Sequence, residues 1–144
     1  MTGIEYDICY TQQRIYRYMA NEGYDMRVFS DAYLKCDFCR RAMDTTYSRF
    51  QVHDELECYD FYMPEIEDQL VKNDSGTNID AVEWIGFMYR YLFIVTGVMS
   101  AELVQKITYD TMLGYYPGLH TVDEDMAVEI ICKDFGLVEN RVEV

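Results

Sequence analysis

Residues 84–97 of this 144-residue chain read Trp-Ile-Gly-Phe-Met-Tyr-Arg-Tyr-Leu-Phe-Ile-Val-Thr-Gly, and this stretch decides the fold class. Apolar residues recur in it at helical spacing and form one stripe, made of Trp84, Ile85, Met88, Leu92 and Val95. Gly97 follows as a residue that commonly ends a helix. A strand over residues 87–98 is the alternative, since aromatic and β-branched residues suit strands, but the apolar positions do not alternate. We therefore predict a long helix that ends at Gly97.

The first half of the chain, residues 1–72, carries the signals of several further helices. Thr2 and Glu5 form a capping box, which predicts a first helix that ends near residues 21–23. Ser30 or Asp31 is expected to cap a second helix. A break at residues 44–46 separates it from a third helical stretch, over residues 50–63. Pro64 is expected in the first turn of a short helix over residues 65–71, where its missing amide costs little.

The second half follows an expected loop at residues 73–79 and covers residues 80–136. After Gly97 we expect a short helix from Ser100 to Ile107 and one or two turns over residues 108–116. A second capping box, of Thr121 and Glu124, is expected to open a final helix that Gly136 ends. Residues 137–144 are expected to form a frayed tail or a short strand.

Together these signals predict an all-α fold: one domain over residues 1–144, built as a bundle of about six to seven helices with irregular orthogonal packing. Half of the residues are apolar and 22 are aromatic, which is ample material for a core. No apolar run reaches the roughly 18 residues that a membrane span needs, and the N-terminus lacks the pattern of a signal peptide. The five cysteines lack the spacing of a disulfide framework, so a reducing cytoplasm is the expected location.

The charge balance bears on the kind of partner. Twelve Lys and Arg residues stand against 26 Asp and Glu residues, so the formal net charge is −14. Such a field repels nucleic acids and anionic membranes, and neither is expected as a partner. It attracts basic proteins and speeds their encounter with this chain. The alternative interpretation is that the acidity serves only solubility.

Catalytic and metal-binding patterns are weak, and we assign no catalytic residue, no metal and no cofactor. Cys36-x-x-Cys39 is half of a zinc motif without a second pair, so buried structural cysteines are the preferred interpretation. His53 and Glu57 share one helix face, which suits a solvated ion pair better than a general base. His120 precedes a helix start, where it is a candidate anion ligand. An enzyme centred on these His and Glu residues remains an alternative.

Tyrosine is unusually abundant, with 14 copies, and it is a residue type that interfaces favour. Exposed tyrosines on an acidic surface suit a partner rich in Arg and Lys, through cation–π contacts and ion pairs. The expected partner-binding residues are Tyr89, Arg90, Tyr115, Tyr116, His120 and Asp123. A second alternative is a nucleic-acid mimic, which requires a continuous acidic stripe, for example through Asp123, Glu124, Asp125 and Glu129.

Two stretches of the chain carry a resemblance to a known family. One is Phe-Ser-Asp-Ala-Tyr-Leu-Lys-Cys-Asp-Phe-Cys-Arg-Arg-Ala-Met-Asp at residues 29–44, followed by Tyr-Ser-Arg-Phe-Gln at 47–51. The other is Trp-Ile-Gly-Phe-Met-Tyr-Arg-Tyr at residues 84–91, with Thr-Gly at 96–97 and His-Thr-Val-Asp at 120–123. Most of residues 27–131 resembles a family of small acidic proteins of gut bacteria, in which many members carry an aromatic residue at the position of Leu92.

That family is found in gene clusters of toxin–antitoxin type, beside toxins that look like ADP-ribosyltransferases. The resemblance implies an antitoxin-like subunit that binds and neutralises a basic toxin. It assigns no catalytic residue.

Overall fold

The computed structural model describes residues 1–73 and 77–144, and it is 73% helical. The described residues form seven α-helices and no strand, which confirms the predicted all-α bundle of several helices. No single helix in this part of the chain is long and apolar enough to cross a membrane. Helices α4 and α5 meet that requirement only as a pair, bent by 113° at the break between them.

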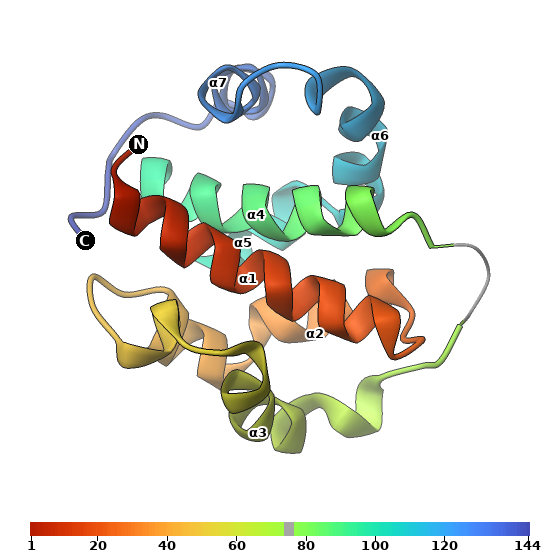
Figure 1. The fold of residues 1–144 in the computed structure, drawn as a ribbon. Coiled ribbons are helices and arrows are strands. Elements are labelled where there is room, and N and C mark those ends of the chain that lie inside the picture. The colour runs from red at the N-terminus through yellow and green to blue at the C-terminus, as the bar shows by residue number, and fades with distance from the viewer. Residues whose placement is uncertain (74–76) are drawn as a thin grey trace.

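Helices α1 (Gly3–Asn21) and α4 (Ile79–Thr96) cross the middle of the molecule side by side (Figure 1). Every residue of α4 from Ile85 to Thr96 is buried, because other helices cover it on all sides. Gly86 brings the two helices together: a Cβ atom at this position would lie 2.7 Å from Cγ of Tyr16. The predicted end of α4 is confirmed, with Gly97 in the left-handed region at φ +70°.

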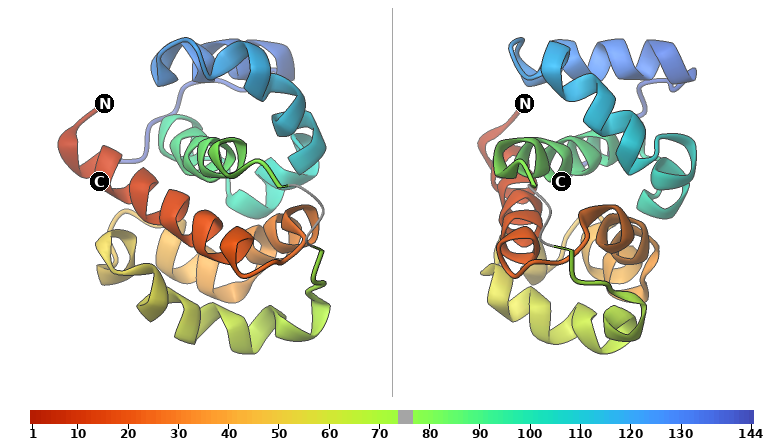
Figure 2. Two further views of the ribbon diagram at one scale, coloured as in Figure 1. Left: turned by 45° about the vertical axis from the view of Figure 1, so that its right-hand side comes forward. Right: turned by 90° about the vertical axis from the view of Figure 1, so that its right-hand side faces the viewer.

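Helices α2 (Met26–Lys35) and α3 (Glu55–Ile66) form a layer that covers one side of the α1–α4 pair (Figures 1 and 2). The same part of the chain forms a π-helical turn, Cys39–Met43, and two short 3-10 helices, Arg49–Val52 and Glu67–Gln69. The capping box of Thr2 and Glu5 opens α1 as predicted.

Two predicted helix starts in this half are wrong. Asp25 caps α2 by accepting the amides of Arg27 and Val28, whereas Ser30 is buried inside the helix and pairs with the Tyr16 hydroxyl. Pro64 lies within α3, close to its end, and does not open a new helix.

The opposite layer contains α6 (Tyr109–Leu119) and α7 (Glu124–Phe135), whereas α5 (Ser100–Lys106) packs against both α4 and α2 (Figure 2). The predicted capping box of Thr121 and Glu124 is wrong. Asp123 caps α7 by accepting the amide of Met126 at 2.9 Å, and the Thr121 hydroxyl instead donates to the carbonyl of Gly118. Gly136 ends α7 in the left-handed region, as predicted.

The C-terminal tail, residues 137–144, is neither frayed nor a strand. The amides of Asn140 and Val142 donate to the carbonyls of Val95 and Ile94 in the last turn of α4, each at 2.8 Å. Arg141 pairs with Glu5 near the start of α1, so the two ends of the chain lie close together (Figure 1). The tail is fixed because it satisfies backbone carbonyls that the end of α4 leaves without a helical partner.

The predicted loop at residues 73–79 is only partly described. Residues 74–76 lie outside the described residues, and Ile79 already belongs to α4, whose N-cap is Asn78. Just before this segment, Lys72 forms an isolated antiparallel bridge with Tyr24.

Candidate functional site

Two of the expected partner-binding residues, Tyr89 and Arg90, have no exposed surface. The expectation of a partner contact is therefore wrong for both. The Tyr89 hydroxyl donates to the carbonyl of Ile107 at 2.5 Å. The error arises because α4 is apolar all round and lies in the core, so its tyrosines and its arginine point into other helices.

Arg90 is the centre of a buried polar network. Its guanidinium pairs with Asp44 at 2.6 Å and donates twice to the side-chain oxygen of Gln12, at 3.0 and 2.8 Å. It also contacts the Cys39 sulfur and the Ser100 hydroxyl, and thereby joins α1, the π-helical turn, α4 and α5. Burial opposes the charge of Arg90, but the Asp44 carboxylate outweighs it and raises the pKa of the guanidinium. This network holds four elements of the fold together, and its charged groups are buried away from any ligand.

The other four expected residues lie in the layer of α6 and α7. Tyr116 and His120 stack with ring centroids 4.3 Å apart, and Trp84 of α4 meets the Tyr116 ring edge-on at 5.8 Å. The Tyr115 hydroxyl donates to Asp134 of α7 at 2.6 Å, and burial together with this carboxylate raises the pKa of Tyr115 to about 12. His120 and Asp123 are exposed, so this part of the expected surface remains a prediction.

The groups named for an enzyme do not meet in one place. His53 hydrogen-bonds Glu57 at the start of α3, while His120 follows α6 in the opposite layer (Figure 2). Glu57 is largely exposed, as expected for a solvated pair. Cys36 and Cys39 are both buried, and the Cys39 amide donates to the Cys36 sulfur at 3.4 Å. Within residues 1–73 and 77–144, no group of three or more His, Cys, Asp or Glu side chains is arranged to hold a metal ion.

The acidic stripe proposed for a nucleic-acid mimic is interrupted. Asp125 and Glu129 are four residues apart and share one face of α7. Asp123 lies before the first turn with an extended backbone, at φ −69° and ψ 159°, and its carboxylate accepts the Met126 amide. It therefore caps the helix and does not continue the face that carries Asp125 and Glu129.

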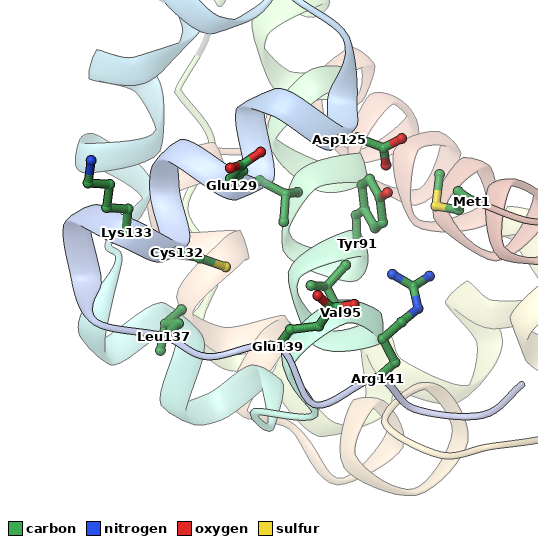
Figure 3. A pocket seen from close by; sticks show the side chains of 11 residues that line it. Met1, Tyr91, Val95, Asp125, Glu129, Cys132, Lys133, Leu137, Glu139 and Arg141 are labelled. Atoms are coloured by element: carbon green, nitrogen blue, oxygen red, sulfur yellow. The ribbon is translucent and has the colours of Figure 1, made fainter.

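A cavity of about 680 Å³ lies between α7, the end of α4 and the C-terminal tail (Figure 3). Helix α7 contributes the carboxylates of Asp125 and Glu129, and the tail contributes Glu139 and Arg141. Tyr91 is 2% exposed and its hydroxyl faces the side of the cavity formed by Asp125 and Met1. The remaining lining residues are mostly apolar or weakly polar: Met1, Val95, Val128, Cys132, Leu137 and, at the rim, Lys133.

Carboxylates dominate the electrostatics of this cavity. Arg141 is neutralised by Glu5, with both carboxylate oxygens 3.1 Å from the same guanidinium nitrogen. Burial and then the Glu139 carboxylate raise the pKa of the Cys132 thiol. Burial, followed by Glu124 and Asp125, likewise raises the pKa of the nearby Tyr6 phenol. Burial is the largest cause of both shifts, and the neighbouring carboxylates act in the same direction.

Sequence reasoning missed this cavity. The only local signal was the pair Asp125 and Glu129 on one face of α7. Tyr91 lies in the core, and the exposure of its hydroxyl to the cavity depends on how α7 and the tail sit over α4. Nothing in the sequence placed residues 139–141 beside α4.

Comparison with known proteins found no match to the chain among family models, curated proteins or solved structures.

Proposed function

We propose that this protein is a neutralising, protein-binding subunit of antitoxin type that binds a basic partner through the layer of α6 and α7. The resemblance of residues 27–131 to proteins of toxin–antitoxin gene clusters supports the biological role. That resemblance also names the kind of partner, a toxin that looks like an ADP-ribosyltransferase. The charge distribution of the fold supports the mode of binding.

The observation that carries the proposal is that most basic side chains pair with carboxylates of the same chain. Among the residues that the structure describes, ion pairs with carboxylates involve seven of the twelve Lys and Arg residues: Arg14, Arg27, Lys35, Arg40, Arg41, Arg90 and Arg141. These pairs occupy only six carboxylates, because Arg40 and Arg41 share Asp37. Most of the 26 acidic side chains are thus left to create an outward negative field, which attracts a cationic protein surface.

The layer of α6 and α7 combines this field with exposed apolar area. Met126 is 49% exposed and Ile130 36% exposed, and the two lie four residues apart on α7. Leu113 of α6 is 38% exposed, and the stacked pair of Tyr116 and His120 adds aromatic area. Interfaces draw affinity from such apolar and aromatic anchors, while surrounding charges set the approach of the partner.

A reducing cytoplasm is the proposed location. All five cysteines are free thiols, and four of them are buried. Burial raises the pKa of Cys36 to about 11 and of Cys39 to about 12, so both thiols stay protonated and unreactive at neutral pH.

The test is co-expression of the chain with the product of the neighbouring gene. We expect a stable complex and rescue of the growth defect that the neighbouring product causes when it is expressed alone. If no complex forms and growth is not rescued, the proposal is wrong.

A matched pair of variants locates the surface. Met126→Lys adds a cation to α7, and Leu56→Lys adds one at a leucine of similar exposure, 51%, on α3 in the opposite layer. We expect Met126→Lys to weaken the complex about ten-fold or more, since it removes an apolar anchor and repels a basic partner. Leu56→Lys should leave the affinity nearly unchanged. The reverse order would place the interface on α3.

A further inference from the structure

We propose that the cavity between α7, α4 and the tail is a binding site for an aliphatic cation, an ammonium or guanidinium group on an alkyl stem. Its identification as a Lys or Arg side chain of the basic partner rests on the proposed function. The site itself rests on the cavity geometry alone.

The charged groups of the cavity select a cation. Asp125, Glu129 and Glu139 line it, and none of the three has an ion-pair partner among the residues that the structure describes. Arg141 is already paired with Glu5, and the ammonium of Lys133 points away from the cavity (Figure 3). The unpaired carboxylates here would repel an anion, whereas a cation would form ion pairs and hydrogen bonds with them.

The Tyr91 hydroxyl supplies a polar anchor at the side of the cavity. Tyr91 is 2% exposed and packs edge-on against Phe87, and its hydroxyl makes no hydrogen bond within residues 1–73 and 77–144. A polar group in this position is normally satisfied by protein, water or ligand. Its oxygen can accept an N–H from an ammonium or guanidinium group that the carboxylates hold.

The apolar part of the lining suits the stem of such a ligand. Met1, Val95, Val128 and Leu137 give the cavity a surface that covers methylene groups while the charged head lies among the carboxylates. The volume of about 680 Å³ lies within the range of roughly 300–1,000 Å³ that is usual for small-ligand sites. A Lys or Arg side chain with its flanking backbone fits within this space.

The first experiment uses the full chain alone, so it does not need the partner. Amide chemical shifts are followed by NMR during titration with the methylamides of N-acetyl-lysine, N-acetyl-arginine and N-acetyl-norleucine, and with spermidine. We expect the Lys and Arg probes and spermidine to shift amides of α7, the tail and the end of α4. The norleucine probe, which keeps the stem and lacks the charge, should bind at least five-fold more weakly. Equal binding of the norleucine probe would overturn the proposal.

Variants test the named side chains. Glu129→Gln and Asp125→Asn should each lower the affinity for the Lys probe about two- to five-fold, which is the usual effect of losing one partly exposed charge pair. Tyr91→Phe should weaken it about two- to ten-fold, since one hydrogen bond is lost. Asp68→Asn, an exposed carboxylate on the 3-10 helix Glu67–Gln69, is the matched control and should change nothing. Unchanged binding in all three cavity variants, with their thermal midpoints preserved, would overturn the site.

The partner assay then separates this site from the proposed function. We expect the double variant Glu129→Gln/Glu139→Gln to weaken the complex with the neighbouring gene product. If the double variant binds the Lys probe more weakly but still forms the complex, a Lys or Arg side chain of the partner does not occupy the cavity. The proposed function stands in that case. If the probes bind but wild-type protein forms no complex, the proposed function is wrong. The cation site is then confirmed, and its occupant is a small amine such as spermidine.

Discussion

At the scale of single residues, Arg90 shows how a charge is kept inside this fold. The guanidinium and Asp44 have side chains that are 0% and 2% exposed, and the hydrogen-bonding capacity of both groups is used by Gln12, Ser100 and the carbonyl of Met43. Such a pair adds little to stability compared with an apolar core, but removal of one partner leaves the other charge buried and uncompensated.

Arg90→Met should therefore lower the free energy of unfolding by about 3–5 kcal/mol. Arg27→Met is the comparison, since its pair with Asp110 is more than half exposed and should contribute no more than about 1 kcal/mol. Urea denaturation followed by circular dichroism measures both. Similar losses in the two variants would show that removal of Arg90 does not leave a costly uncompensated charge at Asp44.

At the scale of elements, the contact of α1 with α4 depends on Gly86. A side chain there has no space, because the nearest atoms belong to the first carbons of Tyr16, which cannot swing away as the end of a flexible side chain would. Gln12 strengthens the same contact by donating to the carbonyl of Gly86 at 2.9 Å.

Gly86→Ala should destabilise the protein by about 1–3 kcal/mol, since α1 and α4 must move apart. Gly114→Ala is the matched control in α6, where an added Cβ meets nothing within 4 Å. It should stabilise the protein by up to roughly 1 kcal/mol through its better helix propensity. Thermal midpoints of the two variants should therefore move in opposite directions, and a shared direction would contradict the packing argument.

The start of α1 is also where the tail is held, and this contact depends on pH. Burial of Glu5 acts to raise its pKa, but hydrogen bonds from the Thr2 amide and from Arg141 outweigh it, so the pKa of Glu5 is lowered. A depressed folded-state pKa means that the contribution to stability is complete above the unfolded value, near 4.3, and is lost as the pH falls through the folded value.

Glu5→Gln should therefore be less stable than wild type at pH 6–7, and the difference should shrink as the pH falls from about 4 towards 2. Urea midpoints at a series of pH values measure this. Amide exchange at Asn140 and Val142 should rise in the variant, because Arg141 loses its charged partner. A stability difference that stays constant with pH would rule out the Glu5 carboxylate as its source.

At the scale of the whole molecule, the net charge of −14 acts on folding and on binding in opposite ways. Within the chain, like charges repel one another and oppose the compact state. Between the chain and a basic partner, the same charges attract. Salt screens both interactions over a Debye length of about 10 Å at 0.1 M.

Raising the NaCl concentration from about 0.02 to 0.5 M should raise the urea midpoint of the isolated protein and weaken its complex with the basic partner. Urea is the suitable denaturant, since it adds no ions. Potassium chloride should act like sodium chloride if the effect is screening. A midpoint that falls with salt would show that attractive ion pairs outweigh the repulsion.

Local sequence patterns determined the elements of this fold. The stripe of residues 84–95 predicted α4, and the signals of Thr2 with Glu5, of Gly97 and of Gly136 located helix ends correctly. These features depend on residues within about one helical turn of one another, so they can be read directly from the chain. The errors at Ser30 and Thr121 are also local, because several adjacent polar residues competed as caps.

Tertiary structure alone decided which polar residues are hidden and where a ligand can bind. The burial of Tyr89 and Arg90, the docking of the tail on α4, and the cavity around Tyr91 all join segments far apart in sequence. Glu5 meets Arg141 and Asp44 meets Arg90 only because the helices pack as they do. No local periodicity encodes such contacts, since they follow from the way apolar faces are shared among the helices of the described chain.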